Sequence, residues 1–399
     1  IQVSPQGWQG RGGGDYWFIP GKFRFCLNCG QTHEVHGKDI NRLASLSGEG
    51  RSSATTILTL SAIRQLFAAQ DLPTDQPDPR NLQAGHFNDF VFLLTLRSAL
   101  IGALQNHQGM LNEETLADAV FKALGFDKTD FGTLAEYLRT PKLMGLARQD
   151  AQRTMRFIIG YRLLRDLRRG WRFNNPNLDQ LNLLSIAYRG LDEFVAETSL
   201  FAAHPVLACI SPEQRATVAS LLFDSMRRSL CLETRYLDPV EQDKAKATAH
   251  QYLNERWAFA SDENLETAKY LILTKRPEYR GKPRTDLVPG GSRSRLLKDI
   301  KAAKFWKDSA AASQVATWKD PQWVELTEQL LQAASHYGYV HKLDVEGAVV
   351  GWRLNASSMD WMLVDEAQAL ENGKHNQFFR SLYLAVAENL RQQDHPLFD

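Results

Sequence analysis

The sequence predicts a mainly α-helical protein: a helical insertion, a winged-helix-like α+β module and a short β-rich segment at the N-terminus. Apolar residues recur at helical spacing over most of residues 82–320. Further on, the period changes to two in the β-rich runs 339–345 and 348–354, which Glu346-Gly347 separates as a hairpin turn would. Aromatic runs around Tyr16 and Phe23 are typical of short strands near the start of the chain.

Short breakers separate the predicted helices. Residues 15–50 are expected to form strands and loops, and residues 53–70 a helix that begins after a serine N-cap. Three prolines within 71–79 end that helix. Further helices are expected at residues 82–106, 113–124, 141–169, 178–198, 212–230, 240–257, 263–274, about 293–305, about 322–335 and about 376–392.

Changes in composition along the chain predict five segments. A Pro/Gly/basic stretch at 275–291 is expected to be a linker, and the helices and hairpin after it have the order of a winged-helix module, which binds duplex DNA. The alternative is a small α+β subdomain that only packs against its neighbours. The segments are 1–50 (β/loop), 51–110 (linker helices), 111–274 (helical insertion), 275–291 (basic linker) and 292–399 (winged-helix-like module and C-terminal helix).

The near-balanced composition of charged residues means that any nucleic-acid-binding site must be a local patch. The chain has 399 residues, with 47 Lys and Arg against 46 Asp and Glu, so its net charge indicates no partner. No run approaches the roughly 18 apolar residues of a membrane-spanning helix, so no membrane contact is expected. Four cysteines do not make a disulfide framework, which favours a reducing, cytoplasmic location.

Two local motifs could hold metal ions. Cys26 and Cys29 have the spacing at which two thiolates grip one Zn²⁺, although the ion needs two further ligands; the alternative is a turn with two free cysteines. Asp365-Glu366 follows a β-rich run, as the Mg²⁺-binding acid of an ATPase does. That box works only with a phosphate-binding loop, and the sequence contains no GxxxxGK[ST]. We therefore assign this chain no catalytic residue and no independent ATP hydrolysis.

Two basic stretches are the candidate phosphate-binding surfaces. Residues 148–172 contain eight arginines, of which Arg162, Arg165 and Arg169 share one helical face. Residues 275–307 contain eleven basic residues against three acids. The alternatives for each stretch are a solvated helix face or internal ion pairs with acids elsewhere in the chain, and for the second stretch also a flexible basic linker. The candidate nucleic-acid contacts are Arg51, Ser52, Arg165, Arg169, Arg293, Arg295 and Lys298.

Several short runs resemble one protein family. They are LQAGHFNDFV at 82–91, GRSSATT at 50–56, LRRGWR at 167–172, NPNL at 175–178 and GWRLNA at 351–356. Together they resemble the bacterial superfamily 2 DEAD/DEAH-type helicases of the MrfA-like group, and within it the antiphage-defence helicases of the Druantia (DruE-like) type. The resemblance covers most of the chain. The family's Thr-Asp-x-Arg-Gln-Asp run is replaced here by TDQPDPR at 74–80.

The resemblance implies a position between two RecA-like lobes. The phosphate-binding loop would precede residue 1 and the arginine finger would follow residue 399, so ATP and Mg²⁺ would be bound by the parent protein outside this chain. Residues 51–110 would begin the second lobe, with Gln83, His86, Asn88 and Asp89 as positioning residues. The expected partner is DNA, guided by this region while hydrolysis elsewhere moves the lobes. The rival expectation is a helical scaffold that docks a defence-system partner protein and never contacts DNA.

Overall fold

A computed structural model describes residues 2–3, 14–15, 85–168, 177–260, 263–274, 278–279, 282–345, 349–364 and 377–392. The chain divides into two compact units, Ile1–Gln76 and Pro77–Asp399. In the first unit, β1 (Gln2–Val3) pairs antiparallel with β2 (Gly14–Asp15). The second unit contains every other element discussed below, and it crosses the predicted boundaries at 110/111 and 274/275 with one principal hydrophobic core.

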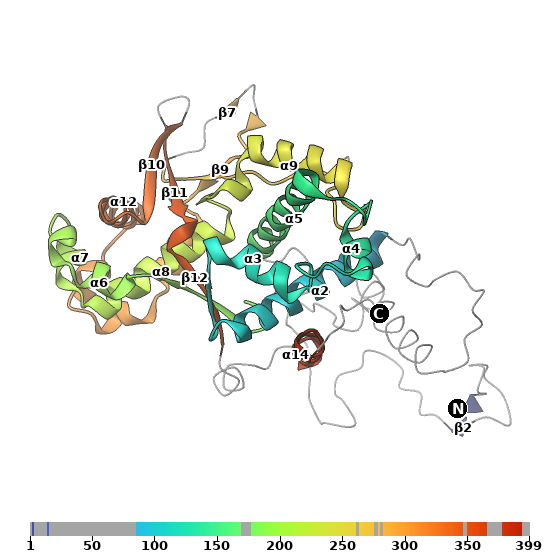
Figure 1. The fold of residues 1–399 in the computed structure, drawn as a ribbon. Coiled ribbons are helices and arrows are strands. Elements are labelled where there is room, and N and C mark those ends of the chain that lie inside the picture. Colours follow the sequence, from blue (N-terminus) through green and yellow to red (C-terminus); the bar gives the residue numbers. More distant parts are fainter. Residues whose placement is uncertain are drawn as a thin grey trace. The chain divides into compact units, whose positions relative to one another are not determined.

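The second unit is mainly helical (Figure 1). Its longest helices are α2 (Gly85–Asn106), α5 (Gly145–Asp166), α8 (Pro212–Arg228) and α12 (Asp320–Tyr337). The other α-helices are α3 (Glu113–Ala123), α4 (Phe131–Tyr137), α6 (Leu191–Ala196), α7 (Pro205–Cys209), α9 (Pro239–Tyr252), α10 (Arg295–Lys301), α11 (Ala312–Val315) and α14 (Gln377–Gln392). Short 3₁₀ turns are η3 (Thr198–Phe201), η4 (Arg235–Leu237), η5 (Lys304–Asp308) and η6 (Ala356–Ser358).

Two sheets share one continuous segment of chain. The five-stranded sheet has the order β10-β11-β6-β9, and β5 also pairs with β11. The three-stranded sheet has the order β3-β12-β4, and a separate small ladder joins β7 to β8. Because only η6 separates β11 from β12, the chain passes directly from the first sheet into the second. The strands are β3 (Met110–Asn112), β4 (Leu184–Tyr188), β5 (Leu232–Glu233), β6 (Tyr270–Ile272), β7 (Glu278–Tyr279), β8 (Lys282–Pro283), β9 (Leu287–Pro289), β10 (Val340–Val345), β11 (Val349–Asn355) and β12 (Met359–Leu363).

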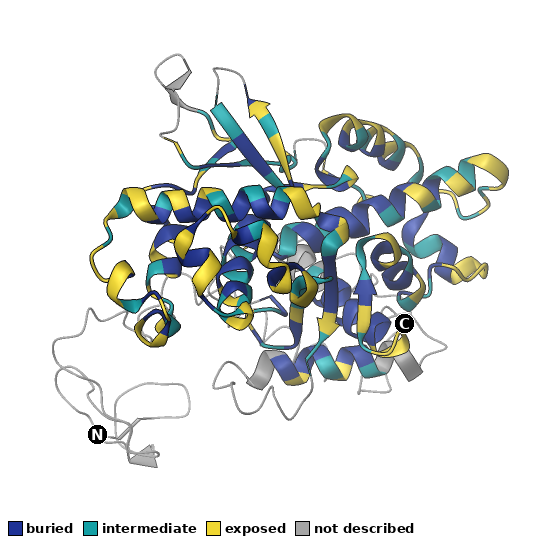
Figure 2. Ribbon diagram, turned by 90° about the vertical axis from the view of Figure 1, so that its left-hand side faces the viewer, coloured by how far each residue is buried: buried dark blue, intermediate teal, exposed yellow. Residues whose placement is uncertain are grey.

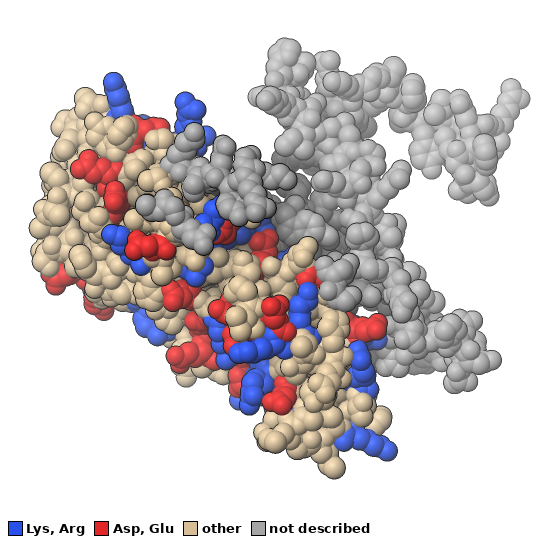
Figure 3. All heavy atoms as spheres, turned by 90° about the horizontal axis from the view of Figure 1, so that it is seen from above, with Lys and Arg blue, Asp and Glu red and all other residues tan. Residues whose placement is uncertain are grey.

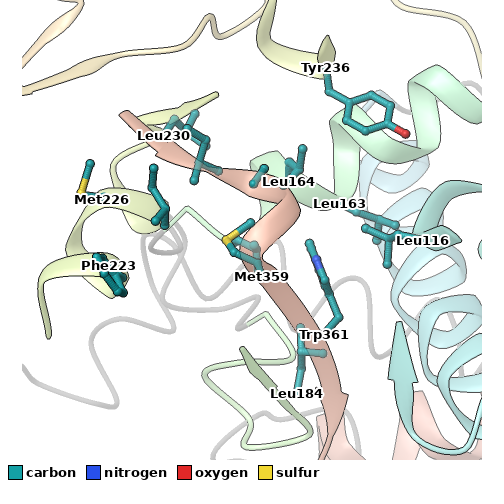
Figure 4. Close-up of a cluster of buried hydrophobic side chains, with 14 of the residues drawn as sticks. Leu116, Leu163, Leu164, Leu184, Phe223, Met226, Leu230, Tyr236, Met359 and Trp361 are labelled. Atoms are coloured by element: carbon teal, nitrogen blue, oxygen red, sulfur yellow. The ribbon is translucent and has the colours of Figure 1, made fainter. Parts of the chain in front are cut away.

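The β11–β12 segment passes through the core between two groups of helices. Figure 4 shows Met359 and Trp361 of this segment between Met226 of α8 and Leu163 of α5. All four side chains are buried. The helices place their buried residues toward this interior and their exposed residues outward (Figure 2). Burial of this segment therefore connects the two groups of helices through the hydrophobic effect.

Most sequence predictions of helices and of the hairpin are confirmed. Helices occur at seven predicted places: α2, α3, α5, α8, α9, α12 and α14. The predicted hairpin is present: β10 and β11 pair antiparallel, with Val345 opposite Val349. The predicted helix at 293–305 is shorter, because α10 ends at Lys301 and η5 follows. The predicted helix at 53–70 and the strands at 15–50 lie outside the described residues, Asp15 of β2 excepted. No described helix is long and apolar enough to cross a bilayer.

Two predicted helices are wrong, and strand pairing is the reason. Residues 178–198 contain β4 and the short α6, separated at Gly190, whose φ of 77° is left-handed. Residues 263–274 contain only strand β6 among their regular elements, and β6 pairs with β11 and β9. In both segments, distant partners override local helical spacing. The predicted linker at 275–291 likewise supplies strand β9 to the main sheet.

We expect opposite effects from alanine at two helical glycines. A Cβ atom at Gly160 of α5 would lie 2.4 Å from ring carbons of Tyr236, whereas at Gly102 of α2 the nearest atom is 3.9 Å away. Gly160→Ala should therefore lower the free energy of unfolding by about 1–3 kcal/mol through overpacking. Gly102→Ala should raise it by about 0.5–1 kcal/mol, because glycine is costly inside a helix. Urea unfolding of both variants checks this, and a stabilising Gly160→Ala would contradict the close packing.

Candidate nucleic-acid interface

Several predicted site residues cannot be placed. His86, Asn88 and Asp89 lie on the first turns of α2, where the structure describes only the backbone. The acidic pair Asp365-Glu366 follows β12 but is outside the described residues, so the ATPase-box interpretation stays untested. The same holds for the candidate contacts and ligands Arg51, Ser52, Arg169, Gln83, Cys26 and Cys29.

The arginines at the C-terminal end of α5 and just after it pair with carboxylates of the segment 263–269. Arg162 donates to Glu263 through both terminal nitrogens, with Nη2 2.6 Å from Oε2. Arg165 reaches the same carboxylate at 3.2 Å. Arg168 pairs with Glu266, which also accepts from Lys269 at 2.9 Å. The alternative of internal ion pairs thus describes Arg162, Arg165 and Arg168, and Arg165 is 36% exposed but already shares the Glu263 carboxylate.

The backbone of the segment 263–269 is also held against its neighbours. The Glu266 N–H donates to the Tyr161 hydroxyl at 2.8 Å, and the Glu266 carbonyl accepts from Gln242 at 2.9 Å. Lys246 donates to the Glu263 carbonyl at 2.7 Å. Although burial opposes ionisation, the Lys269 hydrogen bond and nearby arginines hold the pKa of Glu266 below its ordinary value. These ion pairs are therefore part of the fold.

The second basic stretch forms an exposed surface on α10 and η5. We call Arg293, Arg295, Lys298, Lys304 and Lys307 the α10–η5 basic surface; all five side chains are exposed. Arg295 makes a long pair with exposed Asp299, at 3.4 Å. Within the described residues, Lys298, Lys304 and Lys307 have no ion pair. Unlike the arginines of α5, these cations are therefore free to meet a phosphate backbone.

Local structure explains how this surface is held. Ser294 caps α10: its hydroxyl accepts from the Leu297 N–H at 3.0 Å and donates to the Gly290 carbonyl at 2.9 Å. The loop before the cap places Arg293 at a left-handed φ of 65°. The hydrogen bond of Lys301 to Asp320 is the main cause that holds the pKa of Asp320 below its ordinary value. This pair ties α10 to the start of α12 and leaves the other cations exposed.

The helix in the recognition position of the predicted module presents acids to solvent. α12 directly precedes the β10–β11 hairpin, as the recognition helix does in a winged helix. Its exposed residues include Glu325 and Glu328, and Asp320 lies in its first turn. A helix with this solvent face would meet DNA phosphates with repulsion. Any DNA contact by this module would therefore use the α10–η5 basic surface in place of α12.

The hairpin belongs to a larger sheet. β11 pairs with β10 on one side and with β5 and β6 on the other, so β10 is an edge strand. His341 of β10 pairs with Glu233 of β5 at 2.5 Å. Lys342 is exposed, and its ammonium lies 5.9 Å from the Trp352 ring centroid. Lys342 is thus a further exposed cation on the hairpin, and the residues beside it make contacts within the sheet.

Charges of both signs are interspersed on the face seen in Figure 3. Blue Lys and Arg atoms lie beside red Asp and Glu atoms on this face, in accord with the near-equal totals of the two signs. Within the part of the chain that the structure describes, no group of three or more His, Cys, Asp or Glu residues could hold a metal ion. A local group of unpaired cations is therefore better evidence for a phosphate-binding surface than the total charge.

Three buried arginines have structural roles that sequence reasoning missed. Arg97 makes two hydrogen bonds to Asp166, at 2.6 and 2.8 Å, and one to Tyr383 at 2.7 Å, which joins α2 to α5 and α14. Arg215 donates to the carbonyls of residues 195, 207 and 208. Arg227 bridges the carboxylates of Asp179 and Asp224. The sequence does not show that these arginines are buried, because their partners are distant in sequence or are backbone atoms, apart from Asp224 three residues before Arg227.

Comparisons with family models, with curated proteins and with solved structures found no match to this chain. The resemblance to superfamily 2 helicases therefore rests on the short runs quoted above.

Proposed function

We propose that this chain is the nucleic-acid-guiding accessory region of an ATP-dependent DNA helicase or translocase of the antiphage-defence type. Hydrolysis would take place on parts of the parent protein outside this chain, which bind ATP and Mg²⁺. The α10–η5 basic surface would follow the phosphate backbone without reading bases. Its five exposed cations, of which Arg295 alone makes an ion pair within the described residues, are the observation that carries the proposal.

The arrangement of elements supports a modified winged-helix interpretation. α10, α12 and the hairpin follow one another in the order of such a module, and α10 packs against α12. The acidic solvent face of α12 argues against insertion of that helix into the major groove. Backbone contact through the loop before α10 and through η5 is compatible with the charges, and it is independent of DNA sequence.

A salt series on DNA binding tests the proposal. The variant Arg293→Gln, Arg295→Gln, Lys298→Gln should bind labelled single- and double-stranded oligonucleotides at least about tenfold more weakly than the unaltered chain. The slope of log affinity against log salt should become shallower by about 0.7–0.9 for each phosphate that the variant no longer neutralises. Fluorescence anisotropy at several salt concentrations measures both quantities.

The matched control removes three exposed cations that make local helical pairs. Lys122, Arg153 and Lys244 pair within their own helices at i,i+3 or i,i+4 spacing. Their joint change to glutamine should leave DNA affinity and the salt slope nearly unchanged. If the unaltered chain shows no salt-sensitive binding to either form of DNA, the scaffold alternative is favoured. In the parent protein, unchanged DNA stimulation of ATPase activity by the first variant would count against this surface.

A further inference from the structure

An exposed apolar tip stands among unpaired cations on the connection from α4 to α5 and on the first turn of α5. Met144 and Leu146 are 79% and 78% exposed, the highest values among the exposed large hydrophobic residues of the described part of the chain. Arg139 and Lys142 are exposed and Arg148 is partly exposed, and none of the three has an ion pair within the described residues. We call these five residues the basic–apolar tip. Residues 138–149 contain no acid, so the tip is locally positive.

The loop that carries the tip is anchored at its base. The Arg139 N–H donates to the Tyr252 carbonyl at 2.9 Å, and Leu138 forms a β-bridge with Leu253. Leu143 packs against the core, and its N–H donates to the Thr140 carbonyl at 3.0 Å, which closes a turn. Beyond this base, Gly145 has a φ of 63°, and no atom would lie within 4 Å of a Cβ added there. The fold therefore presents Met144 and Leu146 to solvent on a fixed support.

A surface with complementary chemistry occurs on the same chain, at the start of α6 and the end of α12. Tyr337 is exposed; its ring stacks on Tyr339 with centroids 5.3 Å apart, and its hydroxyl donates to the Gly190 carbonyl at 3.3 Å. A carboxylate oxygen of Glu193 lies near the same glycine, 3.8 Å from the position that a Cβ atom would take there. The acidic–tyrosine patch, as we call it, consists of Asp192, Glu193, Glu197 and Tyr337; all four are exposed.

The carboxylates of this patch are available to a partner. Within the described residues, Asp192, Glu193 and Glu197 have no ion pair. Arg189, the cation just before Gly190, is itself paired with Asp360 at 2.5 Å. Methionine sulfur and arginine both favour aromatic rings, and the three carboxylates match the number of cations on the tip. The two surfaces are thus complementary in charge and in apolar character.

We infer that the basic–apolar tip of one copy docks on the acidic–tyrosine patch of a second copy. Within the second unit, α4 lies at the opposite end from α6 and α12 (Figure 1), so one chain cannot join its own tip to its own patch. The contact is therefore head-to-tail, which generates chains or rings of subunits. Since the tip and the patch contain only a few residues each, we expect the contact to be weak and transient. The contact does not involve the α10–η5 basic surface.

Sedimentation of the whole chain, without nucleic acid, tests this inference. The unaltered chain should associate as its concentration rises toward about 200 µM, and added salt should weaken the association. A tip variant, Lys142→Glu with Leu146→Ser, and a patch variant, Glu193→Lys, should each weaken it by about tenfold or more. Lys142 and Glu193 are charged and exposed, and Leu146 is outside the core, so we expect thermal unfolding to be unchanged.

Mixing the two variants gives the sharpest result. The tip variant keeps an intact patch and the patch variant keeps an intact tip, so a mixture should form a one-to-one dimer that does not grow further. The control Val240→Ser removes an exposed apolar residue at the other end of α9, roughly 18 Å from Tyr252, and should associate normally. Should Glu193→Lys alter folding, Glu193→Gln replaces it. A monomeric unaltered chain, or a mixture that stays monomeric, would overturn the inference.

Discussion

Replacing Arg227 with glutamine should lower the free energy of unfolding by about 3–5 kcal/mol, because it removes the buried cation of an ion-pair network and leaves the partly buried Asp179 and Asp224 with only the exposed Arg228 as a cationic partner among the described residues. The Arg227 side chain is 2% exposed. It donates to Asp179 through both terminal nitrogens at 3.1 Å and to Asp224 through Nε at 3.0 Å. Asp224 also accepts from the Tyr188 hydroxyl at 2.8 Å. Urea unfolding of the variant measures the loss.

The neighbouring arginine provides a matched control. Arg228 contacts the same two carboxylates, at 3.5 Å and 3.2 Å, but its side chain is 44% exposed. Water therefore screens it, and Arg228→Gln should cost less than about 1 kcal/mol. The two changes are chemically identical and lie one residue apart, so the difference between them isolates burial. Equal losses would show that the network around Arg227 is not desolvated as described.

Burial also raises the pKa of Tyr188 well above its ordinary value, with the charge of Asp224 as a further cause. The phenol therefore stays protonated and donates its hydrogen bond to Asp224 through the normal range of pH. β4, which carries Tyr188, is in this way joined to α8, which carries Asp224 and Arg227. Residues 184–188 form a strand because they pair with β12, and the network joins the end of that strand to α8.

Replacing Trp361 with alanine should lower the free energy of unfolding by about 3–5 kcal/mol. Trp361 is among the largest fully buried side chains, and it lies where the β11–β12 segment passes between α5 and α8 (Figure 4). Removal of the indole would leave a void among buried leucines, which the neighbouring helices can fill only in part. Calorimetry and urea unfolding should agree on the loss if the unit unfolds in one step.

Two comparison variants test the cause. The Trp361 indole N–H has no hydrogen-bond partner in the described residues, so Trp361→Phe loses some volume but removes a buried unpaired donor. We expect Trp361→Phe to cost less than half as much as Trp361→Ala. Met362, the next residue, is exposed, and Met362→Ala should cost less than about 1 kcal/mol. A large loss of unfolding free energy in Met362→Ala would contradict the finding that Trp361 is on the buried face of β12 and Met362 on its exposed face.

The sequence predicted the elements that local chemistry specifies. Helix caps at Asn112, Ser211 and Asp238 bond the first-turn amides of α3, α8 and α9, where helices were expected. The hairpin at β10–β11 follows from alternating residues around a glycine turn. The second basic stretch was also recognised as a candidate surface, and its predicted residues Arg293, Arg295 and Lys298 are exposed.

Sequence reasoning could not predict what depends on distant partners. The carboxylate that pairs with Arg162 is 101 residues away at Glu263, so nothing local shows that the arginines of α5 are engaged internally. β6 likewise becomes a strand because it pairs with β9 over three residues and with Trp352 of β11 at Leu271, and both partners are distant from any local helical signal. The acidic solvent face of α12 could be found in the sequence only once the buried side of that helix was known.

By itself, then, the sequence determined a mainly helical chain with a late hairpin and two arginine- and lysine-rich stretches, because spacing, caps and turns act over a few residues. The tertiary structure alone decided which of those stretches keeps its charge for a partner. Ion pairs and strand ladders depend on where remote residues meet. Arg162 and Arg165 of α5 and the following Arg168 meet carboxylates within the fold, whereas the α10–η5 basic surface remains exposed to solvent.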